Sequence, residues 1–130
     1  VTSFNELARD GEHVKRWNML HPEEKDKVSY VEKCLKGRKG PAIASTDYIK
    51  LYAEQIRVVM PTDYTVLGTD GFGRSDTREK LRHFFEVDRF FVAVAALEAL
   101  SKRGEIDQEK VLEAMRKYNI DRNVPNPATR

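Results

Sequence analysis

The chain has 130 residues, enough for one hydrophobic core and too few for two ordinary ones. It is 40% hydrophobic and 34% charged, which is typical of a folded domain with a charged exterior. Because 23 Lys and Arg residues nearly balance 21 Asp and Glu residues, nothing favours nucleic-acid binding, and we expect none. The longest apolar run, FFVAVAAL, is far shorter than the roughly 20 residues of a membrane-spanning helix, so we expect no membrane segment.

The first predicted helix runs from Phe4 to about Leu20, where apolar residues recur at helical spacing. Ser3-Phe4-Asn5-Glu6 has the pattern of a capping box, and Gly11 is expected to weaken the helix locally. His21-Pro22 should end it, since the residue before proline avoids helical geometry. Because a helix begins so early, we expect Val1 and Thr2 to end a strand, and the chain to be part of a longer polypeptide.

A short amphipathic helix is predicted from Tyr30 to Lys36. Cys34 lies in the apolar rhythm of YVEKCLK, which favours a buried structural thiol over a reactive one. As the sole cysteine it cannot form an internal disulfide. This is compatible with a reducing cytoplasm, where we expect the protein.

Two buried strands are predicted, at Pro41 to Ser45 and at Tyr64 to Leu67, because short apolar or β-branched runs are bounded there by turn residues. A helix over residues 48–60 should join them, capped by Thr46 or Asp47 and carrying one apolar face made of Tyr48, Leu51, Tyr52 and Ile56. Parallel strands need such a crossover. The sequence therefore predicts an α/β fold with a mostly parallel sheet in three layers, although two strands are fewer than a complete sheet contains.

Three acidic residues are predicted to cap the remaining helices: Asp76 (with Glu79 completing a capping box), Asp88 and Asp107. The first helix should close at Phe84, and Gly104 should end the second in left-handed geometry. We expect one domain over residues 1–122 and an extended tail, hereafter the tail, over residues 123–130, where two prolines disfavour regular structure.

The loop TDGFGRSDTRE follows a strand and precedes a helix, which is where α/β sheets place ligands. Its chemistry leaves two interpretations open: the arginines could bind an anion, or exposed Phe72 could insert into a neighbouring surface. We favour a contact, because Asp76 competes for the free amides and the spacing matches no phosphate-binding motif. The candidate residues are Gly68, Asp70, Phe72, Gly73, Arg74, Ser75, Asp76 and Arg78.

Other candidate chemistry is weak. His13, His21 and His83 are far apart, without metal-binding spacing, and His83 is more simply a helix-end residue than a base. No nucleophile and base form a defensible pair, so an independent small enzyme is the least favoured hypothesis. We expect no catalytic, cofactor-binding or metal-binding residue in this chain.

The runs TSFNELARDG, RWNMLHP, ASTDYIKLYAEQIR, GTDGFGRSDTREKLRHFFEVD and VAALEALSKRGEID extend over nearly the whole chain. In this order they resemble the carboxyl-terminal region of the bacterial, homodimeric pyruvate dehydrogenase first-component family. Transketolases carry a related loop, whose pattern is matched by Gly68, Asp70, Phe72, Gly73 and Ser75. Asp76 stands where that pattern has glycine.

The resemblance implies a long parent enzyme with a transketolase-like carboxyl-terminal domain, of which this chain would lack the leading strands. The parent would decarboxylate pyruvate on thiamine diphosphate with Mg²⁺ and reductively acetylate the lipoyl group of dihydrolipoyl acetyltransferase. Its implied partners are the remaining domains of the parent chain, a second copy of that chain, and the acetyltransferase. The family's cofactor motif, GDG with a downstream asparagine pair, does not occur here. We therefore expect a scaffold for domain and dimer interfaces; the alternative is a ligand- or partner-binding module using the Gly68–Arg78 loop.

Overall fold

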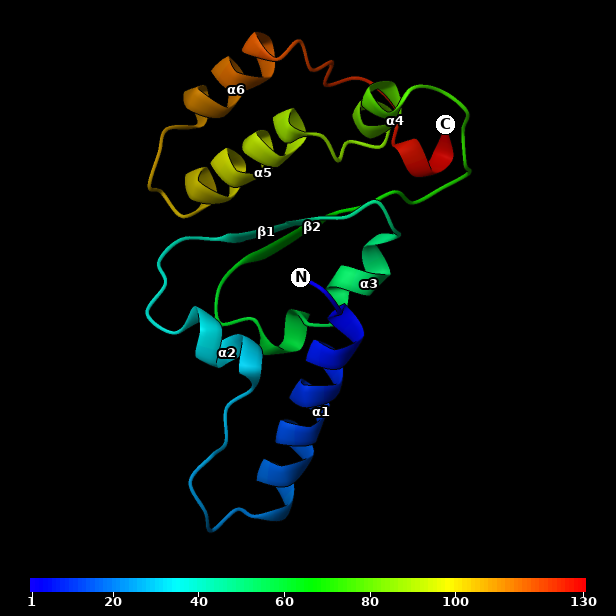
Figure 1. Cartoon of the computed structure of the whole chain (residues 1–130). Coiled ribbons are helices and arrows are strands. Elements are labelled where there is room, and N and C mark those ends of the chain that lie inside the picture. Colours follow the sequence, from blue (N-terminus) through cyan, green and yellow to red (C-terminus); the bar gives the residue numbers. More distant parts are fainter. The chain divides into compact units, whose positions relative to one another are not determined.

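The structure, a computed structural model, describes every residue from Val1 to Arg130. The chain divides into two compact units, one of Val1–Lys39 with Leu51–Thr62 and one of Gly40–Lys50 with Asp63–Arg130. The elements, labelled in Figure 1, are α1 (Phe4–Leu20), α2 (Tyr30–Leu35), β1 (Ala42–Ser45), α3 (Lys50–Glu54), the 3₁₀ helix η1 (Arg57–Val59), β2 (Tyr64–Leu67), α4 (Arg78–Phe84), α5 (Arg89–Lys102), α6 (Gln108–Lys117) and the 3₁₀ helix η2 (Pro127–Thr129).

Helix α1 begins and ends where the sequence predicts. The Ser3 hydroxyl accepts the Glu6 amide at 3.2 Å, whereas the Glu6 carboxylate forms an ion pair with Arg9. Gly11 is buried within this helix: a Cβ there would lie 2.7 Å from Cγ1 of Val59. The missing side chain at Gly11 therefore lets η1 approach α1.

The RWNMLHP segment organises the turn after α1. The rings of Trp17 and His21 stack at 4.3 Å, and the Lys27 ammonium lies 3.6 Å from the centre of the Trp17 ring. The Asn18 side chain accepts the Lys27 amide at 2.9 Å and donates to its carbonyl at 3.0 Å. Ser29, which is fully buried, then begins α2 through a capping box with Glu32.

The expectation of a buried Cys34 is wrong, because this side chain is exposed. The six-residue helix α2 buries Val31, with Leu35 on the same face one turn later, so the neighbouring row of Tyr30 and Cys34 faces solvent. A hydrogen bond with Cys34 raises the pKa of the Tyr30 hydroxyl.

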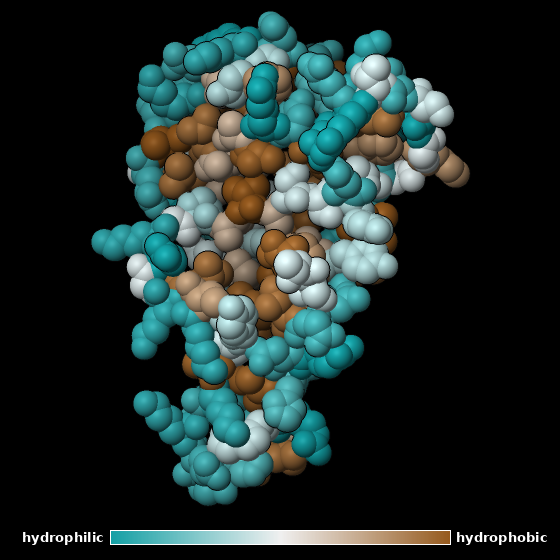
Figure 2. All heavy atoms as spheres, in the orientation of Figure 1, coloured by the Kyte–Doolittle hydropathy of each residue, from teal (hydrophilic) through white to brown (hydrophobic).

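The second unit contains the parallel sheet and confirms the α/β prediction. Strand β1 pairs with β2 from Ala42 opposite Tyr64 to Ser45 opposite Leu67. Tyr64 and Val66 of β2 are buried, whereas β1 is only half-buried, less than predicted. Helix α5 contacts both strands and α6. Figure 2 shows hydrophobic side chains gathered over α5, whereas hydrophilic ones predominate over α6.

The core between α5 and α6 depends on the predicted apolar spacing. Val94, Val111 and Ala114 are buried at its centre, and Leu97, Met115, Tyr118 and Ile120 pack around them. Asp88 and Asp107 cap these helices as predicted, and Gly104 follows α5 at φ +73.

Four further predictions of local structure are wrong. The helix predicted over residues 48–60 is only α3 followed by η1, because the Tyr48 carbonyl accepts a hydrogen bond from Thr69 instead of starting a helical turn. Tyr48 and Leu51, expected on a buried face, are exposed. Thr77 rather than Asp76 caps α4 and accepts the Lys80 amide at 3.4 Å. The tail is not wholly extended, since Pro127 starts η2 and the Asn126 side chain caps it.

Candidate interface loop

The loop between β2 and α4 is anchored first to the segment that follows β1. The Thr69 amide donates to the Tyr48 carbonyl at 2.9 Å, and the Thr69 hydroxyl donates to the Asp47 carbonyl at 2.8 Å. The Lys50 amide donates to Asp70 Oδ1 at 3.2 Å, and the Lys50 ammonium lies 3.8 Å from Asp70 Oδ2. Asp70 therefore satisfies a free amide at the start of α3 from 20 residues away.

Gly68 makes this anchor sterically feasible. A Cβ at Gly68 would lie 2.8 Å from the Lys50 nitrogen and 2.9 Å from the Tyr48 carbonyl oxygen. Both neighbours are backbone atoms, which cannot turn aside as a side chain can. The glycine at this position thus serves the close approach of two backbone segments.

A second anchor joins the loop to the tail and to α4. Gly71 has φ +106, and a Cβ there would lie 2.9 Å from both Ala128 Cα and the Pro127 carbonyl oxygen. Three residues later, the Arg74 guanidinium lies 4.1 Å from the centre of the Phe84 ring. The loop is therefore held on both sides of residues 72 and 73.

Between the anchors the loop presents an aromatic side chain to solvent. Phe72 is 89% exposed, as predicted, and a Cβ on Gly73 would have no neighbour within 4 Å. Ser75 is also exposed. An anchored loop that holds an exposed aromatic ring has the features of a contact surface.

The polar groups of the loop do not converge on one point. The Arg74 guanidinium stacks on Phe84. Asp76 Oδ1 accepts the Thr77 amide at 2.7 Å and lies 3.8 Å from the Lys80 ammonium. Arg78 is exposed at the start of α4. These positions give no shared arginine fork for a carboxylate or phosphate.

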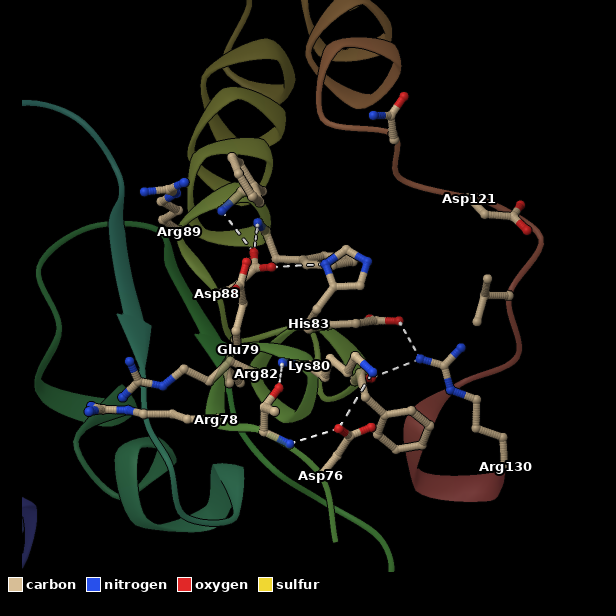
Figure 3. A pocket seen from close by; sticks show the side chains of 18 residues that line it. Asp76, Arg78, Glu79, Lys80, Arg82, His83, Asp88, Arg89, Asp121 and Arg130 are labelled. Carbon is tan, nitrogen blue, oxygen red and sulfur yellow. Dashed lines mark hydrogen bonds and ion pairs between the residues drawn. The ribbon is translucent and has the colours of Figure 1, made fainter. Parts of the chain in front are cut away.

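An open pocket beside α4 is lined by many charged side chains (Figure 3). Its charges alternate in sign: the cations are Arg78, Lys80, Arg82, Arg89 and Arg130, and the acids are Asp76, Glu79, Glu86, Asp88 and Asp121. His83 Nδ1 lies 2.9 Å from Asp88 Oδ2, while Asp88 Oδ1 caps α5. Because the charges balance and Asp88 is occupied by the cap, this pocket has neither the charge of an anion site nor a nucleophile paired with His83.

The structure adds residues that the sequence did not single out. Thr69, Lys50 and the tail residues Pro127, Ala128 and Arg130 hold the loop. Of these residues, only Thr69 could have been found from the sequence, because it adjoins the predicted loop residues. No local pattern pairs residues 47–50 or 127–130 with the loop. No three His, Cys, Asp or Glu side chains are grouped so that they could hold a metal ion. No helix has both the length and the apolar character needed to cross a bilayer.

Residues 1–88 match the family model described as the transketolase-like TK C-terminal domain. Proteins named pyruvate dehydrogenase E1 component are 66% identical over 128 residues in Pseudomonas aeruginosa, 62% over 125 in Cupriavidus necator and 59% over 128 in Escherichia coli. These matches cover 98%, 96% and 98% of this chain, respectively. The chain spans 14% of the length of each of these relatives.

Proposed function

The chain belongs to the transketolase-like C-terminal domain family, and from this membership we propose that it is the carboxyl-terminal region of a pyruvate dehydrogenase E1 component. The observation that carries the proposal is 66% identity to such a protein over 98% of the chain. The match extends over both strands and all the helices from α1 to α6. This extent supports a shared domain rather than a shared motif.

The parent enzyme in this proposal is an oxidoreductase of the cytoplasm that links glycolysis to acetyl-group transfer. It decarboxylates pyruvate with thiamine diphosphate and Mg²⁺, then reductively acetylates the lipoyl group of dihydrolipoyl acetyltransferase. The residues of this chain do not fit the cofactor, because they form neither a cluster of metal ligands nor a diphosphate loop. We therefore assign cofactor binding to other parts of the parent chain.

The role of this region is to build contacts with other parts of the parent chain and with a second copy of it. Residues 1–122 belong to the α/β domain, and residues 123–130 form its tail. A scaffold matters for rate, because displacing a catalytic framework by about 1 Å can lower the rate by roughly a hundredfold. The Gly68–Arg78 loop is the part best suited to such a contact, since Phe72 is exposed while its neighbours are fixed.

A ligand-binding module is the weaker alternative for the same loop. It would need its arginines free for an anion, yet Arg74 lies over the Phe84 ring. It would also need a helix amide free at the start of α4, where Thr77 already accepts the Lys80 amide. The contact interpretation requires only the exposed Phe72.

The parent's activity is tested by purifying the full-length polypeptide that contains this sequence. With thiamine diphosphate and Mg²⁺ it should release labelled carbon dioxide from pyruvate labelled at the carboxyl carbon. No release from pyruvate, with release from another 2-oxo acid, would refute the assigned substrate.

The interface role is tested in the same polypeptide with Phe72→Ala. Sedimentation should show a dimer dissociation constant raised by about tenfold, because a buried aromatic anchor contributes on the order of 1–2 kcal/mol. Met19→Ala, at a 70% exposed side chain in α1, is the control. A Phe72→Ala protein that dimerises and turns over like the wild type would remove the loop from the interface. Weaker binding of inorganic phosphate in an Arg74→Gln/Arg78→Gln variant would instead favour the ligand-binding alternative.

A further inference from the structure

The last five residues of the described chain, Asn126 to Arg130, lie against the candidate interface loop and the end of α4 (Figures 1 and 3). We call them the strap. The strap is a formed element, since the Asn126 side chain accepts the Ala128 amide at 2.9 Å and Pro127 opens η2. Its backbone therefore has a defined shape to press against the loop.

The first contact joins strap backbone to loop backbone at Gly71. The Cβ that Gly71 lacks would lie 2.9 Å from both Ala128 Cα and the Pro127 oxygen. Any other residue would also be strained there, because φ is +106. A small cavity of about 60 Å³ is lined by Gly68 and Asp70 of the loop and by the strap residues Asn126 to Ala128. Strap and loop thus face each other over several residues.

The second contact joins the strap to α4 through Arg130. One Arg130 amine donates to the Phe84 carbonyl at 2.8 Å, and the guanidinium lies 4.4 Å from the centre of the Phe84 ring. The same amine lies 4.0 Å from Glu86 Oε1. Only 20% of the Arg130 side chain is exposed, so these contacts are shielded from water.

Arg130 and Arg74 share the Phe84 ring. The loop's Arg74 lies 4.1 Å from the ring centre and the strap's Arg130 lies 4.4 Å from it. A planar guanidinium stacks on an aromatic face in a way that an ammonium cannot. Arg130 Nε is buried and has no hydrogen-bond partner, which is energetically unfavourable. The hydrogen bond to the Phe84 carbonyl and the contact with the Phe84 ring must offset this cost.

We propose that Arg130 is a positioning residue: it fastens the strap across α4, and the strap holds Gly71 so that Phe72 is presented in one orientation. This inference rests on the proposed interface role of the loop and adds the element that controls it. The anchor made by Thr69 and Asp70 holds only the side of the loop near α3. Without the strap, residues 71–75 would keep only the Arg74 contact with Phe84.

The test compares Arg130→Ala with the wild type in the full-length parent protein by limited chymotrypsin digestion. Cleavage within residues 71–75, after Phe72, should be about tenfold faster, because one charged hydrogen bond and one cation–π contact are lost. Cleavage within β2, residues 64–67, should not change. Arg122→Ala removes the same charge from an exposed position just before the tail and should leave both segments unchanged. Arg130→Lys should have a smaller effect than Arg130→Ala, since lysine keeps the charge and a hydrogen-bond donor but loses the planar stack.

Two results would overturn the proposal: unchanged cleavage within residues 71–75 in Arg130→Ala, or equal acceleration in Arg122→Ala. If Arg130→Ala fails to fold, Ala128→Gly serves instead, because it loosens the strap without removing a buried charge. It too should speed cleavage within residues 71–75 only.

Failure of the interface role would look different. If Arg130→Ala speeds loop cleavage while Phe72→Ala leaves dimerisation intact, the strap holds the loop and the interface assignment is wrong. If Phe72→Ala weakens the dimer while Arg130→Ala changes neither cleavage nor dimerisation, the interface stands and the strap proposal is wrong.

Discussion

Replacing Gly68 with alanine tests the close approach on which the loop depends. The new Cβ would lie 2.8 Å from the Lys50 nitrogen, 2.9 Å from Lys50 Cγ and 2.9 Å from the Tyr48 oxygen. Two of these atoms belong to backbone, so the segments must separate by several tenths of an ångström. Separation would lengthen the bonds from Thr69 to Tyr48 and from Lys50 to Asp70, now 2.9 Å and 3.2 Å.

The expected cost is about 1–3 kcal/mol, the usual range for overpacking a closely packed site. Hydrogen exchange in the full-length parent protein would register this as roughly 5- to 150-fold faster exchange of the hydrogen-bonded amides of Lys50 and Thr69. Gly73→Ala is the matched control in the same loop, because its Cβ would meet no atom within 4 Å. That variant should be neutral or slightly stabilising, by up to about 1 kcal/mol, through the unfolded state.

The reasoning would be refuted if the two alanine variants behaved alike. Equal acceleration would mean that the loop requires glycine for conformational freedom and not for space. If neither variant changed the exchange rates, β2 and the segment after β1 would not be in contact at Gly68.

Three further predictions concern the helices, each measured by thermal unfolding of the parent protein. Gly11→Ala should lower stability by about 1 kcal/mol despite alanine's higher helix propensity, because its Cβ meets Val59 at 2.7 Å; in a Val59→Ala background the same change should instead stabilise by up to about 1 kcal/mol. Ser29→Ala should cost about 1–2 kcal/mol, since this fully buried residue caps α2; no loss would show that the cap is dispensable. Asp88→Ala should cost a similar amount, about 1–2 kcal/mol, through the amides of Phe90 and Phe91, whereas Glu98→Gln, at an exposed pair, should cost less than about 0.5 kcal/mol.

Local chemistry was sufficient to predict most of the elements. Strand β2 has the predicted bounds, Asp88 and Asp107 cap the predicted helices, and Gly104 ends α5. Each of these features depends on residues within about one turn of one another, so a sequence window contains the whole cause. The same holds for the exposure of Phe72, since a lone aromatic between glycines has no neighbour to pack against.

The errors arose where a local preference competed with a distant partner. Residues 48–60 have helical spacing, but the Tyr48 carbonyl bonds to Thr69 and the first amide of α3 bonds to Asp70, 20 residues away. Cys34 has apolar spacing, but α2 is too short to bury more than one face.

The sequence by itself determined most of the helices, both strands and the resemblance to a family, because capping, periodicity and motif order depend on neighbouring residues. Only the tertiary structure decided what the loop is attached to. The Arg130 contact with Phe84 joins residues 46 positions apart, and no local pattern encodes such a pairing. The strap reaches this place because it packs against Gly71, which has no side chain to keep it away. Such packing exists only once the chain has folded.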